Sequence, residues 1–115
     1  MSNAKKKTEA GSTPEYPIPD GHVPVMVTTE HRGVFFGYVD PVTVEGDART
    51  VRLFRVRMCV YWTADVRGVL GLAHTGPSSE SKVTPPNASA RISAVTGVFT
   101  CSGEAVDAWE SAPWR

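Results

Sequence analysis

The sequence lacks an excess of charge of either sign, because 12 lysines and arginines balance 12 aspartates and glutamates. A net charge near zero argues against a strongly electrostatic nucleic-acid or membrane binder, although it is compatible with a local basic stripe. The sequence also lacks any segment that approaches the roughly 20 apolar residues of a membrane helix. No apolar run follows Lys5–Lys7, so no secretory signal is expected and the predicted location is the cytoplasm.

Cysteine is scarce, and the two that occur, Cys59 and Cys101, form no Cys-x-x-Cys pair. Metal sites usually show such pairs or closely spaced histidines, so we expect no metal centre. Both cysteines lie in apolar, strand-like surroundings, which is typical of buried, reduced thiols and not of nucleophiles. The glycine-containing run 67–71 lacks the lysine of a P-loop and the wider context of a dinucleotide-binding loop. We therefore expect no catalytic residue and no cofactor.

A chain of 115 residues fits one domain with a small core, which partner subunits could extend. Residues 1–21 are polar, and Pro14, Pro17 and Pro19 favour an extended, disordered arm over a helix. This arm is either a solvated tail or a latch on a neighbouring subunit. Residues 22–115 are the predicted domain, and a homo-oligomer is expected because near-neutral proteins associate easily.

Short apolar segments rich in β-branched residues, separated by turn residues, predict a sheet. Gly37 and Gly97 interrupt two of these segments and indicate bends. The expected fold is mainly β within the α+β class: a small, strongly bent antiparallel sheet or barrel of about five or six strands with a short C-terminal helix. The expected strands are Val23–Thr29, Val34–Val39, Val42–Val44, Thr50–Val56, Met58–Trp62 and the strand-like Ala90–Cys101, with a hairpin tip at Glu45-Gly46-Asp47.

The C-terminal helix is predicted to start after Ser102, which is a good N-cap. Val106 and Trp109 belong to its apolar stripe, and Pro113 ends it. Farther upstream, residues 66–72 fit both one face of a helix and a strand. Their glycines lower helix propensity, so both alternatives stay open.

Four arginines, Arg49, Arg52, Arg55 and Arg57, cannot all share one face of a straight strand, because side chains alternate with a period of two. A bulge or turn near Phe54–Val56 would reconcile their spacing. These arginines are candidate phosphate contacts for an RNA- or single-strand-binding barrel, with the aromatic residues that follow stacking on bases. They are alternatively solvated strand positions that discourage edge pairing.

The stretch Arg57–Gly76 holds the densest run of large side chains and supplies the candidate ligand- or partner-binding residues. Asp65 and Arg67 can pair with each other, or Arg67 can present its planar guanidinium to an anionic group. The two adjacent aromatic residues in this stretch are either core or a platform for a ligand. The candidates are Tyr61, Trp62, Asp65, Arg67 and His74.

Most of the chain, from Val27 to Trp114, resembles a family of small uncharacterised proteins encoded by bacteriophages and prophages. The resemblance implies a phage or bacterial cytoplasmic setting, and it carries over no site because that family has no assigned activity. The residues that carry it are His31-Arg32-Gly33-Val34-Phe35, Arg57-Met58-Cys59-Val60-Tyr61-Trp62, Ala64-Asp65-Val66-Arg67-Gly68-Val69-Leu70-Gly71-Leu72 with Thr75-Gly76-Pro77, and Glu104-Ala105-Val106 with Trp109-Glu110.

A shorter part, Gly33–Val39 followed by Val51-Arg52-Leu53, is similar to the bent second and third strands of Sm-like and SH3-like barrels. This similarity implies a small-barrel architecture. It implies no ligand, because no loop of the sequence matches the RNA-binding loops of Sm-like proteins.

Together these observations predict a non-enzymatic binding or interaction protein of phage or prophage origin. It would work as a homo-oligomer on a host protein or on a small anionic ligand. Two alternatives come from other classes: an RNA- or single-strand-binding small barrel that uses the four arginines, and a small hydrolase. The hydrolase ranks last because the sequence shows no nucleophile–base pair.

Overall fold

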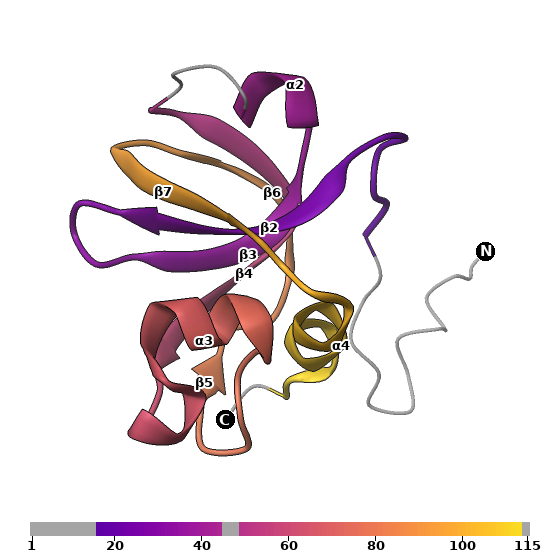
Figure 1. The fold of residues 1–115 in the computed structure, drawn as a ribbon. Helices are drawn as coiled ribbons and strands as arrows, with labels where there is room; N and C mark the ends of the chain where they lie inside the picture. The colour runs from indigo at the N-terminus through magenta and orange to yellow at the C-terminus, as the bar shows by residue number, and fades with distance from the viewer. Residues whose placement is uncertain (1–15, 45–48, 114–115) are drawn as a thin grey trace.

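A computed structural model describes residues 16–44 and 49–113, so the predicted hairpin tip and arm residues 1–15 lie outside the described residues (Figure 1). Residues 16–19 have no regular secondary structure. No helix in the described part is long and apolar enough to cross a membrane. The strands are β2 (Val23–Thr29), β3 (Val34–Val39), β4 (Val51–Tyr61), β5 (Lys82–Val83), β6 (Asn87–Ile92) and β7 (Val95–Thr100); the helices are α2 (Pro41–Val44), α3 (Gly68–His74) and α4 (Gly103–Ser111), with a 3-10 turn at Ala64–Val66.

The strands form one antiparallel sheet in the order β5-β4-β3-β2-β7, and β6 pairs with the first half of β4. β6 and β7 are joined by Ser93 and Ala94, yet they lie at opposite ends of the pairing order, so the sheet curls back toward itself (Figure 1). β6 and β7 do not pair, and the sheet is not closed into a barrel. The predicted α+β class is confirmed, in its bent-sheet form.

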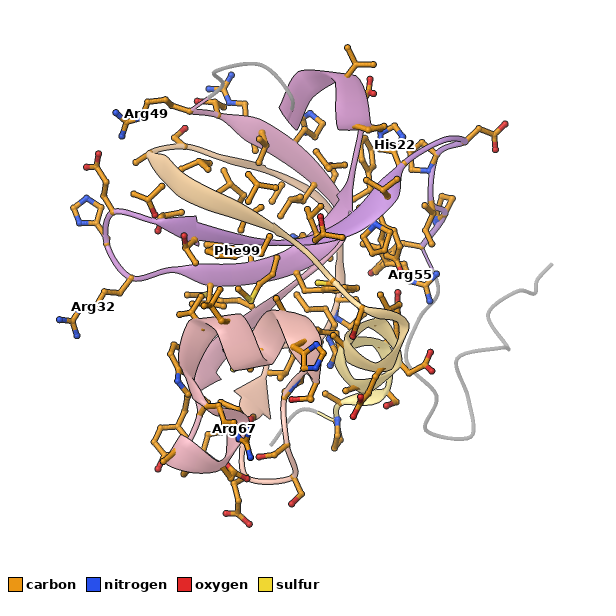
Figure 2. All side chains as sticks on the ribbon, viewed as in Figure 1. His22, Arg32, Arg49, Arg55, Arg67 and Phe99 are labelled. Carbon is orange, nitrogen blue, oxygen red and sulfur yellow. The ribbon has the colours of Figure 1, made fainter. Side chains whose placement is uncertain are left out.

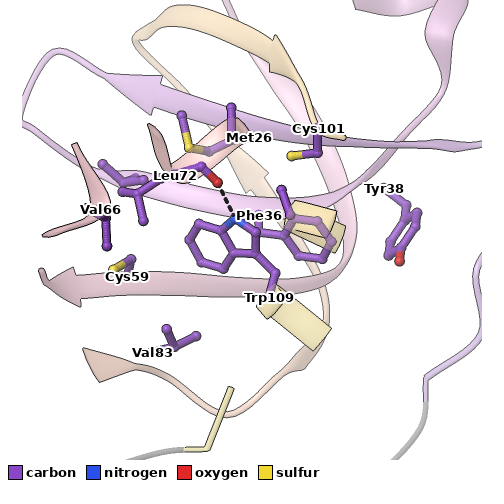
Figure 3. Close-up of a cluster of buried hydrophobic side chains, with 12 residues drawn as sticks. Met26, Phe36, Tyr38, Cys59, Val66, Leu72, Val83, Cys101 and Trp109 are labelled. Atoms are coloured by element: carbon purple, nitrogen blue, oxygen red, sulfur yellow. Dashed lines mark hydrogen bonds between the residues drawn. The ribbon is translucent and has the colours of Figure 1, made fainter. Parts of the chain in front are cut away.

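Both faces of β2, β3 and β4 contribute to apolar clusters, because different residues of each of these strands enter two separate clusters. The inner cluster draws only on the curled strands: Val25, Val27, Val39, Val51, Leu53, Val56, Ile92 and Val95. The outer cluster lies between the sheet and the helices α3 and α4, and Figure 3 shows its main members: Met26, Phe36, Tyr38, Cys59, Val66, Leu72, Val83, Cys101 and Trp109. β3 is covered on both faces, since Phe36 enters the outer cluster and Val39 the inner one, with Phe35 packed against the latter.

β4 is one continuous strand where the sequence predicted two, and it contains a bulge. Tyr38 pairs with Phe54 but Phe36 pairs with Arg57, so β4 has one extra residue in this interval. Arg55 accommodates it with a φ of 57°, in the left-handed region. The bulge that the arginine spacing predicted in this interval is therefore confirmed.

The predicted strand Val42–Val44 is wrong, because these residues belong to the short helix α2. Pro41 occupies the first helical position, where its fixed φ suits a helix and its missing N–H is not needed. The side chain of Asp40 caps this turn by accepting a hydrogen bond from the Val42 N–H at 3.0 Å. The β-branched composition favoured a strand, but the Asp-Pro pair in front of it starts a helix.

Helix α3 resolves the open alternative for residues 66–72, since Gly68–His74 are helical. Arg67, between the 3-10 turn and α3, has a left-handed φ of 66°. Gly71 is required by a close approach, because a Cβ there would lie 1.6 Å from the carbonyl oxygen of Val66. The glycine that lowers helix propensity therefore lets α3 pack against the turn that precedes it.

Helix α4 confirms the predicted C-terminal helix and its cap. The Ser102 Oγ accepts a hydrogen bond from the Ala105 N–H at 3.1 Å. Trp109 is fully buried, and its indole ring stacks on Phe36 with centroids 5.3 Å apart and an interplanar angle of 8° (Figure 3). The indole N–H donates to the Leu72 carbonyl of α3 at 3.0 Å. Trp109 thus joins the sheet to both helices.

A buried arginine fixes the end of α4 against the sheet. Arg57 has 3% of its surface exposed, and burial lowers its pKa while the nearby Glu110 carboxylate opposes that shift. Its guanidinium donates to four carbonyl oxygens: those of Thr84 at 2.8 Å, Trp109 at 2.7 Å, Glu110 at 3.2 Å and Ala112 at 2.5 Å. Three of these carbonyls lie at the C-terminal end of α4, where a cation is favourable.

Glu110 also holds a second polar contact beside this clamp. Its Oε2 accepts the Tyr38 hydroxyl at 2.6 Å, and its Oε1 pairs with Arg55 at 3.1 Å. Burial and the hydrogen bond to Glu110 raise the pKa of Tyr38, so its hydroxyl stays protonated as a donor. These groups are structural, because each one connects α4 to β3 or β4.

Candidate functional site

Two hollows beside α3 share Phe99 of β7, which Figure 2 labels. One has a volume of about 540 Å³ and the other about 400 Å³. We call both together the α3 groove. Its lining residues are Thr28, Thr29, Arg32, Gly33, Val34, Trp62, Val69, Leu70, Ala73, His74, Val98, Phe99, Thr100, Cys101 and Ser102.

Local geometry keeps Phe99 at the centre of the α3 groove. β7 carries a bulge beside β2, because Thr28 pairs with Gly97 while Thr29 pairs with Val95. A Cβ at Gly97 would lie 2.8 Å from the Phe99 ring, so only glycine leaves room for the ring to lie back along its own strand. The bend predicted at this glycine is thus confirmed.

Helix α3 presents more apolar surface than the sheet covers. Leu72 and Ala73 are buried in the outer cluster, whereas Leu70 has 68% of its surface exposed. Val69 is half-buried and lines the smaller hollow, and Leu70 lines the larger one. Leu70 and the apolar residues that line the two hollows form a contiguous apolar surface, which is a feature of interaction sites.

The rim of the α3 groove carries positive and neutral polar groups. Arg32 lies at the turn between β2 and β3, and His74 lies at the last turn of α3. The described residues that line the groove include no aspartate or glutamate. A complementary ligand would therefore be apolar at its centre and neutral or acidic at its ends.

The structure separates the candidate residues of the central stretch. Trp62 and His74 line the α3 groove, and Trp62 also packs against the outer cluster. Tyr61 is 49% exposed at the end of β4 but does not line the groove. Trp62 therefore packs against the core with one part of its side chain and lines the groove with another.

Asp65 and Arg67 make no ion pair or hydrogen bond with each other in the described part of the chain. Asp65 accepts a hydrogen bond from the Thr63 hydroxyl, and this bond together with one from Ser78 lowers the pKa of its carboxyl group. Arg67 is exposed, and its backbone N–H donates to the Ala64 carbonyl at 3.0 Å. The alternative in which the two residues pair is wrong, since Asp65 bonds to hydroxyl groups.

The four candidate arginines do not form one basic surface. Figure 2 shows Arg49 and Arg55 at opposite sides of the molecule. Arg49 pairs with Glu30, and Arg55 pairs with Glu110. Arg57 is buried in the clamp on α4, and Arg52 alone of the four is exposed without a carboxylate partner among the described residues. The nucleic-acid-binding alternative required all four arginines as phosphate contacts, and of these only Arg52 remains available to a phosphate group.

Sequence reasoning missed Leu70, Val69, Val98 and Phe99 as surface residues, because apolar residues are first assigned to the core. One signal was available in α3. Of the five positions 69–73, all but Gly71 are apolar. That is more apolar surface than a helix can bury when only one of its faces packs on a sheet. No comparable signal marked Phe99, whose half-buried position depends on where α3 lies.

The two cysteines are expected to react slowly with a thiol reagent in the folded protein. Both are buried, and burial raises the pKa of each thiol, to about 11 for Cys101. Little reactive thiolate therefore exists at neutral pH. A time course with a chromogenic disulfide reagent, with and without denaturant, measures this. Rapid modification of the native protein at pH 7 would contradict the expectation and make Cys59 a nucleophile candidate again.

The described residues contain no cluster of three His, Cys, Asp or Glu side chains that could hold a metal ion. Comparison with protein families matches residues 22–109 to a family described as a domain of unknown function, DUF6948. No curated protein and no solved structure matches the chain.

Proposed function

The chain belongs to the DUF6948 family, and we propose from its geometry that it is a non-catalytic binding protein whose α3 groove takes up an apolar segment of a partner protein. The observation that carries the proposal is the exposure of Leu70, at 68%, in the larger of two hollows that share Phe99. Burying one leucine side chain contributes about 1.5–3 kcal/mol, so this residue is a natural centre for an interface.

The polar residues at the rim of the α3 groove indicate which kind of partner segment would fit. Because Arg32 and His74 border the groove and its lining has no carboxylate, the segment is apolar with acidic residues near its ends. Hollows of about 400 and 540 Å³ each accommodate one or more large side chains. A short helix or turn that presents two neighbouring apolar side chains fits this arrangement.

The cellular setting remains part of the proposal. The resemblance to phage and prophage proteins supports a phage-derived protein that acts in the bacterial cytoplasm on a host protein. Homo-oligomer formation is the competing use of the same surface, because a second copy could cover Leu70 as well. The experiment below distinguishes the two.

Site-specific photo-crosslinking tests the proposal in bacterial cells. A photoreactive phenylalanine derivative at position 70 is expected to give a discrete covalent adduct with one other protein. Val42 is the matched control, since it is 77% exposed on α2 and lies outside the α3 groove. The adduct should disappear when Phe99→Ala or Val69→Asp is combined with the photoreactive residue.

Three outcomes would contradict the proposal. An adduct of twice the monomer mass would assign the surface to a second copy. Equal crosslinking from positions 70 and 42 would mean that contact is unspecific. An undiminished adduct in the Val69→Asp background would place the contact outside the groove.

A further inference from the structure

Two arginines from distant parts of the sequence oppose each other on the outer face of the β4–β6 pair. Arg52 and Arg91 are direct cross-strand partners, and both are exposed. Their neighbours Leu53 and Ile92 point into the inner cluster, so the two guanidinium groups extend from the opposite face. Like charges directly opposite each other destabilise a strand pair, so this arrangement is unfavourable in the protein alone.

No carboxylate relieves this repulsion within the described residues. Arg52 donates a long hydrogen bond from Nη1 to the Ser89 Oγ at 3.4 Å, and Arg91 takes part in no ion pair with another residue of 16–44 or 49–113. Arg49 and Arg55, on either side of Arg52 in the sequence, each have a glutamate partner. Arg52 and Arg91 are therefore two adjacent positive charges that no carboxylate of the described residues neutralises.

The surroundings of the pair are polar, neutral and partly aromatic. Ser89 lies opposite Phe54 on the same face, and Thr50 and Ser93 are exposed just beyond Arg52 and Arg91. Phe54 is half-buried, with the His22 ring packed edge-on against it at 5.3 Å. We call this surface the β4–β6 face: Thr50, Arg52, Phe54, Ser89, Arg91 and Ser93. It shares no residue with the α3 groove.

We propose that the β4–β6 face binds single-stranded nucleic acid, with Arg52 and Arg91 on backbone phosphates and the Phe54 ring against a base. Guanidinium groups bind phosphate through paired N–H donors, and the hydroxyl groups around them add neutral donors. A bound phosphate removes the repulsion between the two arginines, so the energy lost in the unbound sheet returns on binding. Alternation of arginine and an aromatic ring on a sheet matches the way extended strands of nucleic acid are held.

The near-zero net charge sets the character of this binding. Attraction comes from two local charges and not from the whole molecule, so affinity is modest and depends on salt through few contacts. The site contacts backbone phosphates and the face of a base and does not read base edges. It should therefore bind nucleic acids of different base sequence. This site is independent of the proposed protein-binding groove, and either one can fail without the other.

Fluorescence anisotropy of the full chain with a labelled oligouridylate of about 20 nucleotides, at several salt concentrations from about 50 mM upward, tests the proposal. Arg52→Gln combined with Arg91→Gln should weaken binding roughly tenfold or more at the lowest salt. Each lost phosphate contact flattens the slope of log affinity against log salt by about 0.7, so two flatten it by about 1.4. Phe54→Leu should weaken binding at least about fivefold.

Lys82→Gln is the matched control, because Lys82 is an exposed cation of β5 and lies outside the β4–β6 face. It should bind like the unsubstituted chain, and the lysines of residues 5–7 are present in every variant. The double variant should keep or raise the Tm, since it removes the repulsion between the two opposed charges. An unchanged or higher Tm would show that its loss of binding is not caused by unfolding.

Several results would overturn the proposal. One is the absence of oligouridylate binding by the unsubstituted chain at the lowest salt. Another is undiminished binding by the double variant, or an equal loss in Lys82→Gln. Inorganic phosphate is the remaining arm: if it competes as well as the oligonucleotide at equal phosphate concentration, the face is a simple anion site and the assignment to nucleic acid is wrong.

Discussion

Trp109→Ala is expected to lower the free energy of unfolding by about 3–5 kcal/mol. The side chain is fully buried, stacks on Phe36 and is the largest in the outer cluster. Its removal leaves a cavity between the sheet and both helices, and it leaves the Leu72 carbonyl without the indole N–H. Since small domains are stable by only about 5–15 kcal/mol, this one change removes a large part of the total.

Urea unfolding followed by circular dichroism measures this loss. Asp107→Ala is the matched control in the same helix, because Asp107 is exposed and its change should stay within about 0.5 kcal/mol. Trp109→Phe keeps an aromatic ring against Phe36 but loses the N–H, so it should lie between the two. A loss below about 1 kcal/mol for Trp109→Ala would show that α4 does not pack on the sheet as described.

Arg57→Ala is expected to destabilise the protein by about 3–5 kcal/mol, because it leaves the buried Trp109 carbonyl without a donor, at about 1–3 kcal/mol, and three partly buried carbonyls at less each. The four carbonyls belong to the segment after β5 and to the end of α4. Their loss should loosen α4 first, so amide hydrogen exchange should accelerate there more than in β2 or β3.

Two variants make this measurement specific. Arg57→Lys keeps the charge but lacks the planar fork that reaches carbonyls on both sides, so it should recover only part of the stability. Arg52→Ala removes an exposed arginine of the same strand and should change the unfolding free energy by about 0.5 kcal/mol or less. Equal effects of Arg57→Ala and Arg52→Ala would contradict the clamp.

The parts of the fold that the sequence predicted are those decided by local chemistry. β2, β3 and α4 follow from β-branched runs, turn residues and the Ser102 cap, each of which acts within a few positions. The bulge at Arg55 was predictable because a break in side-chain alternation is itself a local signal. α2 was missed because three β-branched or apolar residues outweighed a single capping aspartate, although that cap decides the backbone.

The candidate site depends on contacts between distant segments, and this is where sequence reasoning was limited. Arg57 looked like a phosphate ligand, but it is buried by a helix that begins far downstream in the chain. Arg91 carried no signal at all, because it becomes notable only when β6 places it opposite Arg52. Trp62 and His74, which flank the glycine-rich segment that folds into α3, both line the groove, and their role in binding stays a prediction.

The pairing of β2 with β7 has a consequence for how the chain acquires its structure. Val25 pairs with Thr100, so β2 cannot complete its hydrogen bonds until β7 has been synthesised. Such contacts between distant segments raise the contact order. During synthesis, β2, β3, β4 and β6 leave the ribosome before β7, so β2 exposes an unpaired edge until residues 95–100 have emerged. Completion of the sheet is therefore a late step, and a nascent chain stalled before residue 95 would be the species most exposed to aggregation.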